Sequence, residues 1–152
     1  MEGPLGLPAL PWQQREITSI LPHRPPFLFV DRVLEVEPDR RIRGEKWWAA
    51  SEGLITTRNG RAMVPASLLM EAMAQLGASL ILMKEENRGK IIYFMGIEKV
   101  RYRSPLAAGE TLSMEAEVVR LRARIGTLTG RAEVAGRAVA NGTMHFALGA
   151  EA

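Results

Sequence analysis

The sequence predicts an α+β fold in which one antiparallel β-sheet curls around a single buried helix. Residues 65–86 are rich in strong helix formers and are apolar nearly all round, which is typical of a helix enclosed by protein. Two strand-like segments precede this helix and four follow it. A helix that is apolar on every side must be buried on every side. A sheet of these strands, wrapped around the helix, would bury it.

The length of 152 residues predicts one domain, with 47% hydrophobic and 24% charged residues as in ordinary globular proteins. Three prolines in the first 11 residues indicate a flexible leader at 1–11, followed by a single domain at 12–152. The start of the chain lacks the basic residues and continuous apolar stretch of a signal peptide, so we expect a cytoplasmic protein.

The segments before the long helix are assigned from proline, glycine and β-branched residues. We expect a helix at 12–21 that Pro22 ends, a rigid turn at 22–26, and a hairpin of strands at 27–36 and 40–50. Residues 51–63 show no clear period and are expected to form a loop.

The segments after the long helix are all expected to be strands, at 90–104, 110–123, 124–135 and 137–148. The helix itself is a poor membrane span, because only about 19 residues precede its charged end and they include Glu71 and Gln75.

Composition excludes several kinds of chemistry. The chain has no cysteine and two histidines, so thiolate sites are excluded and we expect no metal or other cofactor. The net charge is +3, but acidic and basic residues are interleaved, so nucleic-acid binding is not expected.

The long helix carries a single polar stripe. Its only polar side chains before the charged end lie four residues apart and so share one face: Ser67, Glu71, Gln75 and Ser79. An ionised carboxylate inside a sheet-wrapped helix is costly unless it is paired or hydrated. We therefore expect Glu71 to face a cleft, with an ion pair to an arginine as the alternative. Ser79 is expected only to bond the preceding turn of the helix.

The start of this helix adds a possible anion or carbonyl site. Val64 offers no side-chain cap before Pro65, so the backbone N–H groups of Ala66 and Ser67 are expected to be free. A free N–H group that holds a carbonyl oxygen, together with a base at Glu71, is a minimal pair for acyl chemistry.

Four sequence blocks resemble the FabZ-type (3R)-hydroxyacyl-acyl-carrier-protein dehydratases. LPHRPPFLFVDRVL at 21–34 is similar to the family's LPHRxPFLLVDRVL, and VPASLLMEAMAQ at 64–75 to its MPGVLIxEAxAQ. YFMGIEKVRYRSP at 93–105 and AGE at 108–110 match a further strand and turn of that family. The resemblance runs from about residue 12 to the C-terminus.

The resemblance implies the hotdog fold, a long helix wrapped by an antiparallel sheet. It also implies active sites between two subunits, hence a homodimer or a trimer of dimers. The substrate would be an acyl thioester of acyl-carrier protein or coenzyme A, in a tunnel beside the helix, with Ser67 and Gln75 as substrate contacts. Phe94 and Met95 would line this tunnel, with a place in the core as the alternative for both.

The implied catalytic residues are Glu71 on the helix and the N–H of Ala66, which stands where the family has glycine. The family's loop histidine, in GHFPGxPVMPG, is absent: counting back from Pro65 places Thr57 there. His23 belongs to the family's structural N-terminal block and His145 to the last strand, and both are expected to have packing roles.

Three functions therefore remain open. One is a FabZ-like dehydratase with weakened or altered chemistry, because a threonine hydroxyl accepts no proton at neutral pH. The second is a hotdog thioesterase in which Glu71 activates water while Thr57, Ser67 or Gln75 orients the substrate. The third is a non-catalytic subunit that binds acyl-carrier protein.

Overall fold

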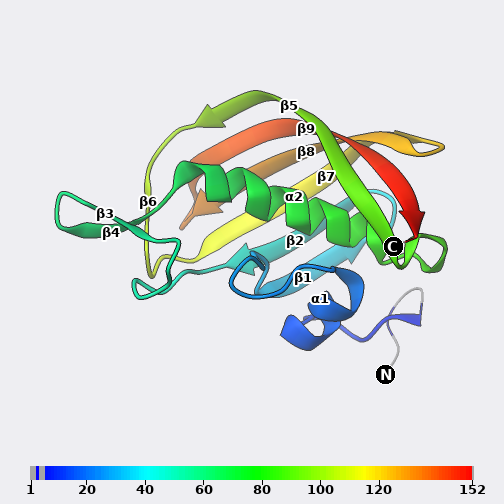
Figure 1. Cartoon of the computed structure of the whole chain (residues 1–152), viewed down its shortest axis with the longest axis horizontal. Helices are drawn as coiled ribbons and strands as arrows, with labels where there is room; N and C mark the ends of the chain where they lie inside the picture. The colour runs from blue at the N-terminus through cyan, green and yellow to red at the C-terminus, as the bar shows by residue number, and fades with distance from the viewer. Residues whose placement is uncertain (1–2, 4–5, 152) are drawn as a thin grey trace.

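A six-stranded antiparallel sheet forms most of the chain, for which the computed structural model describes residues 3 and 6–151. Its strands follow the order β1-β2-β7-β8-β9-β5 across the sheet (Figure 1). Their bounds are β1 Arg32–Glu37, β2 Arg41–Lys46, β5 Lys90–Tyr102, β7 Leu112–Arg122, β8 Ile125–Val134 and β9 Arg137–Glu151. The predicted hairpin before the long helix and the four strands after it are thus confirmed as one sheet.

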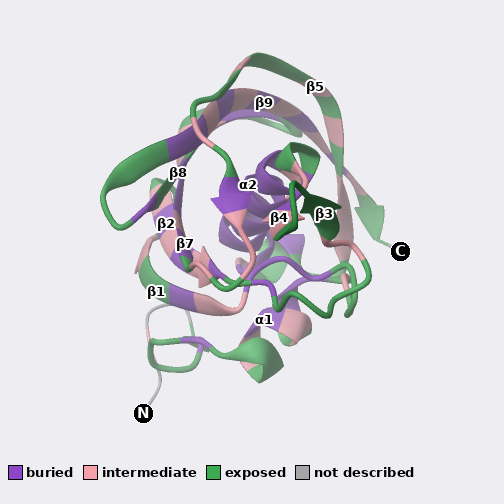
Figure 2. Ribbon diagram, turned by 90° about the vertical axis from the view of Figure 1, so that its left-hand side faces the viewer, coloured by how far each residue is buried: buried purple, intermediate pink, exposed green. Residues whose placement is uncertain are grey.

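Helix α2, Ala66–Leu82, lies in the hollow of this sheet, which curves around it in the end-on view (Figure 2). Fourteen of its residues, Leu68 to Met70 and Ala72 to Leu82, are buried, as an apolar helix inside a sheet requires. At Gly77 the helix approaches β8 so closely that a Cβ atom would lie 2.6 Å from Cδ1 of Leu128. The predicted α+β architecture is confirmed. A short 3₁₀ turn, Glu85–Asn87, links α2 to β5.

The N-terminal segment packs against the first strand. Helix α1, Gln14–Ile20, follows Trp12, whose backbone pairs with that of Val33. The Trp12 indole donates to the carbonyl of Pro8 at 2.9 Å, and Leu7 is only 4% exposed. Part of the expected leader therefore contacts the core, while residues 1–2 and 4–5 lie outside the described residues and the leader's flexibility stays a prediction.

The segment expected to be a loop contains a hairpin instead. Strands β3, Thr56–Arg58, and β4, Arg61–Val64, pair around Asn59 and Gly60, whose φ angles of 50° and 73° suit a tight hairpin turn. With β6, Leu106–Ala107, they form a second, three-stranded sheet beyond the start of α2 (Figure 1). The expectation of a loop at 51–63 was therefore wrong for these residues, because strands of three and four residues are too short to show a hydrophobic period.

The first strand begins later than expected, at Arg32 rather than residue 27. The Gln75 side chain accepts the backbone N–H of Phe29 and donates to the carbonyl of Phe27, so residues 27–29 are held by the helix rather than by a neighbouring strand. A side chain on α2 thus replaces the ladder bonds that the sequence pattern predicts there.

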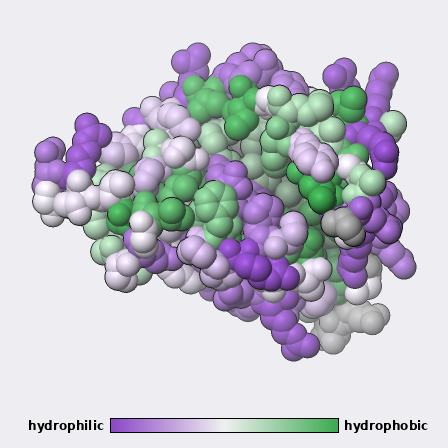
Figure 3. Space-filling model, in the orientation of Figure 1, coloured by the Kyte–Doolittle hydropathy of each residue, from purple (hydrophilic) through white to green (hydrophobic). Residues whose placement is uncertain are grey.

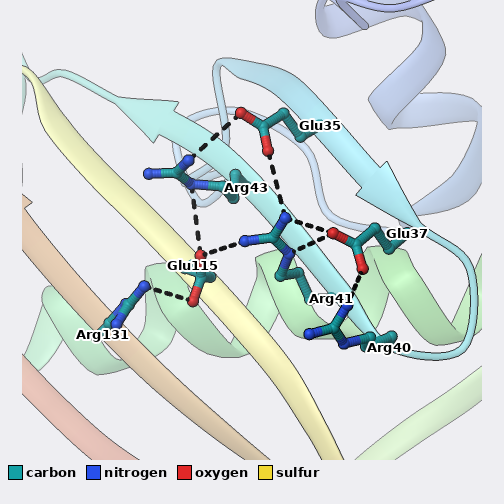
Figure 4. Close-up of polar contacts among 7 residues, drawn as sticks. All are labelled: Glu35, Glu37, Arg40, Arg41, Arg43, Glu115 and Arg131. Atoms are coloured by element: carbon teal, nitrogen blue, oxygen red, sulfur yellow. Dashed lines mark hydrogen bonds and ion pairs between the residues drawn. The ribbon is translucent and has the colours of Figure 1, made fainter.

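The outer face of the sheet carries a network of charged side chains (Figure 4). Glu115 on β7, whose side chain is 8% exposed, forms ion pairs with Arg41 and Arg43 on β2 and with Arg131 on β8. The residues on either side of Glu115, Met114 and Ala116, are buried, since successive strand residues face opposite sides. This network therefore lies on the side of the sheet away from α2. Among the described residues, no helix is long and apolar enough to cross a membrane.

Candidate active site around Glu71

Glu71 lies in the second turn of α2 with its side chain 35% exposed, at the edge of a cavity of about 160 Å³. The cavity lies between the N-terminal block, α2 and β5, and is lined by Pro22, His23, Glu71, Gln75, Ala78, Leu82, Ile91, Ile92 and Phe94. Within the described part of the chain, no arginine forms an ion pair with Glu71. The carboxylate is therefore open to a ligand on an otherwise largely apolar wall.

Gln75 fixes this carboxylate. Its Nε2 donates to Oε1 of Glu71 at 3.0 Å and to the carbonyl of Phe27 at 3.1 Å, and its Oε1 accepts the N–H of Phe29 at 2.7 Å. The side chain is 1% exposed, and both amide hydrogens are used. Gln75 thus orients Glu71, and the substrate contact expected for it would require breaking one of these bonds.

His23 approaches the same carboxylate oxygen from the N-terminal block. Its Nε2 lies 4.0 Å from Oε1 of Glu71, and its side chain is 32% exposed. Burial lowers the pKa of His23 below the usual histidine value, the charge of Glu71 opposes this, and the charge of Arg24 lowers the pKa further. The imidazole is therefore neutral at neutral pH.

The turn that carries His23 is held by its neighbour. The Arg24 guanidinium donates through Nη1 to the carbonyl of Leu21 at 2.8 Å and to that of His23 at 2.7 Å. Leu21 is fully buried, so these bonds tie the turn to the core. The backbone on both sides of His23 is thereby held by one guanidinium group.

A second cavity, of about 650 Å³, lies at the start of α2 and contains Ala66 among its lining residues, with Arg58, Arg61 and Arg103. Pro65 forms no side-chain cap, and the first turn is closed by the N–H of Leu68 on the carbonyl of Pro65 at 3.0 Å. The N–H groups of Ala66 and Ser67 therefore have no helical partner and are available to an oxygen atom.

Of the other residues predicted for the site, one lines a cavity and three do not. Phe94 lines the cavity beside Glu71 and also packs against Phe146, with ring centroids 6.5 Å apart. Thr57 and Ser67 are exposed, Met95 is 58% exposed, and none of the three lines either cavity. The structure thus brings Glu71, Gln75 and Phe94 together, and the roles expected for Thr57, Ser67 and Met95 stay predictions.

His23 is the residue of this site to which sequence reasoning gave only a packing role. The sequence does not show that His23 lies beside Glu71. Tertiary contacts bring the turn at 22–26 to α2, and no shared helix or strand relates the two residues. Among the described residues, no three side chains of the metal-binding types gather into a possible metal site.

Comparison with known proteins agrees with this fold. The model of the FabA-like domain family matches residues 21–143, a span that includes His23, Glu71 and Phe94. The chain belongs to the FabA-like family. It is 44% identical over 138 residues to a 3-hydroxyacyl-[acyl-carrier-protein] dehydratase FabZ from Roseiflexus sp. (strain RS-1), covering 90% of this chain and 96% of that one.

One further relative and one solved structure extend the comparison. The FabZ of Bacillus subtilis (strain 168) is 41% identical over 139 residues, covering 89% of this chain and 96% of the relative. A solved structure described as the dehydratase heterocomplex ApeI:P from Xenorhabdus doucetiae superposes with a TM-score of 0.76 at 17% identity, covering 94% and 93% of the two chains. The chain is thus a FabZ homologue with the hotdog fold of its FabA-like relatives.

Proposed function

We propose that this protein dehydrates (3R)-3-hydroxyacyl thioesters to trans-2-enoyl thioesters. The observation that carries the proposal is the Glu71 carboxylate, held by Gln75 and facing an apolar cavity. An acyl chain fits apolar walls, and a carboxylate at their edge is suited to proton transfer at the carbons next to the thioester. The identity of 44% to a FabZ over most of both chains supports the same reaction.

Dehydration needs two proton movements. A proton leaves C2 of the acyl chain, and the hydroxyl on C3 leaves as water after gaining a proton. Glu71 is the group that protonates the leaving hydroxyl, and the free N–H of Ala66 polarises the thioester carbonyl. The hydroxyl of Thr57 is no replacement for a histidine as base, since it accepts no proton at neutral pH.

The thiol portion of the substrate is proposed to be the pantetheine arm of acyl-carrier protein, since the FabZ relatives are named as dehydratases of 3-hydroxyacyl-[acyl-carrier-protein]. A coenzyme A thioester is the alternative carrier. The cytoplasm remains the proposed location.

A second copy of the chain is proposed to complete the site. The outer edge of β5 has no neighbouring strand within the described residues, and its side chains Tyr93, Met95 and Ile97 are 57%, 58% and 50% exposed. Hydrophobic residues gather over this strand in the space-filling view (Figure 3). An unpaired apolar edge favours pairing with another chain, and a copy there would lie beside the cavity at Glu71. A dimer is the minimum assembly, and a trimer of dimers would bury the same edge.

The experiment gives the purified protein both 3-hydroxyacyl and plain acyl thioesters on acyl-carrier protein, and follows enoyl formation and thiol release separately. Enoyl product supports the dehydratase. Thiol release without enoyl product contradicts it and identifies a thioesterase, in which Glu71 would activate water. Binding without either product also contradicts it and identifies a non-catalytic subunit.

A further inference from the structure

We propose that His23 is the second catalytic residue of this site, the base that removes the C2 proton. This inference rests on the proposed dehydration and adds to it the residue that replaces the absent loop histidine. It assigns a chemical role to a turn whose sequence indicates only packing.

The position of His23 is the first argument. Its Nε2 lies 4.0 Å from Oε1 of Glu71, the same oxygen that Gln75 holds at 3.0 Å. Both side chains line one cavity, whose other walls are largely apolar. An acyl chain in that cavity would therefore meet an imidazole and a carboxylate side by side, which is the pair of groups that the reaction needs.

The other histidine provides a contrast within the same chain. His145 on β9 also faces a glutamate, with its Nε2 3.2 Å from Oε1 of Glu98, but its Nδ1 lies 2.9 Å from the hydroxyl of Thr127. Both ring nitrogens of His145 thus have partners, and it does not line the cavity at Glu71. In His23 the Nδ1 is buried and bonds no atom of the described residues. His145 is held as a structural group would be, whereas His23 is not.

The charges around His23 suit a base that is neutral at rest. Glu71 from α2 and Arg24 from its own turn are the charged groups that act on it, while β5 presents Ile91, Ile92 and Phe94. Burial keeps the ring neutral and able to accept a proton, and the nearby carboxylate stabilises the imidazolium once it forms.

The proposed step balances without any further reactant. Nε2 of His23 takes the proton from C2, and the electrons of that C–H bond move onto the thioester carbonyl to give an enolate. The imidazolium passes this proton to Glu71, which gives it to the hydroxyl on C3. The C3–O bond then breaks, its electron pair leaves with water, and the enolate electrons form the C2=C3 double bond. His23 and Glu71 both end in the protonation states in which they began.

The test compares His23→Gln with His145→Gln as the matched control, using the full-length protein and a 3-hydroxyacyl thioester on acyl-carrier protein. We expect kcat for enoyl formation to fall about 10²- to 10⁴-fold in His23→Gln and to stay unchanged in His145→Gln. Thermal unfolding of each variant separates loss of fold from loss of chemistry, and His23→Asn serves as a second variant if the first unfolds.

Two further readouts identify a proton-transfer role. The wild-type rate rises with pH through an ionisation below about 6.5, because only the neutral ring accepts the proton, and His23→Gln lacks that ionisation. Added imidazole restores part of the rate to His23→Ala. A folded His23→Gln protein that keeps the wild-type rate overturns this inference alone, whereas a wild-type protein that makes no enoyl product overturns the proposed function as well.

Discussion

Gln75 Oε1 on helix α2 accepts the backbone N–H of Phe29 at 2.7 Å, joining residues 46 positions apart in the chain. Through its Nε2, the same amide reaches Glu71 at 3.0 Å. One buried side chain thus fixes both the turn region that follows His23 and the carboxylate of the site. Stability and catalytic geometry are therefore coupled at this residue.

Replacing Gln75 by leucine tests that coupling. The fully buried Phe29 loses the acceptor for its N–H, so we expect the free energy of unfolding to fall by about 1–3 kcal/mol. Urea denaturation measures this change. Ser79→Ala is the control, because among the described residues the Ser79 hydroxyl bonds only the carbonyl of Gln75 in its own helix, and its loss should cost less than about 1 kcal/mol. Equal losses in the two variants would contradict the role given to Gln75.

The ionisation of His23 also predicts how stability depends on pH. Burial lowers its pKa in the folded protein, so between that pKa and about 6.5 the unfolded chain binds more protons than the folded one. The stability that His23 contributes is thus present above about pH 6.5 and is lost as pH falls through the folded pKa.

Urea denaturation of wild type and His23→Gln across pH 5 to 8 measures this contribution. The free energy of unfolding should rise more steeply with pH in the wild type over the acidic part of this range. Parallel curves for the two proteins would show that the pKa of His23 is the same in both states.

Histidine at position 57 tests whether the hairpin of β3 and β4 still presents that position to a substrate. Thr57→His should raise the dehydration rate at least about tenfold, because it restores a base where the resemblance places one. Thr57→Gln is the control, because glutamine places a side chain of similar size at the same position but accepts no proton. No gain from Thr57→His would indicate that the hairpin holds this position away from the substrate.

We expect the exposed edge of β5 to form a dimer interface, which a single charge introduced on that strand would disrupt. Ile97→Lys should shift the protein toward monomer in sedimentation velocity and lower the dehydration rate together with it, because a lysine is costly in an apolar interface. Ile125→Lys is matched in chemistry and exposure, 56% against 50%, but lies on β8, and should leave the assembly unchanged. A wild-type protein that is monomeric and fully active would contradict the proposed second copy.

The sequence predicted the helix because it is apolar and buried nearly all round, and the six strands because turn residues separate segments rich in β-branched and aromatic residues. It missed the hairpin of β3 and β4, whose strands of three and four residues are too short to show a period, and the late start of β1, which depends on a side chain of α2. Glu71 was found because a carboxylate stands out on an apolar helix. His23 was not, because its approach to Glu71 is a tertiary contact between segments with no shared period.

The central claim is that Glu71 takes part in dehydration, and the rate of enoyl formation from a 3-hydroxyacyl thioester on acyl-carrier protein tests it most directly in Glu71→Gln. Glutamine keeps the size of the side chain but carries no transferable acid proton. We predict that kcat falls about 10²-fold or more while the variant unfolds at the wild-type temperature. A folded Glu71→Gln protein that forms enoyl product at the wild-type rate would contradict the account.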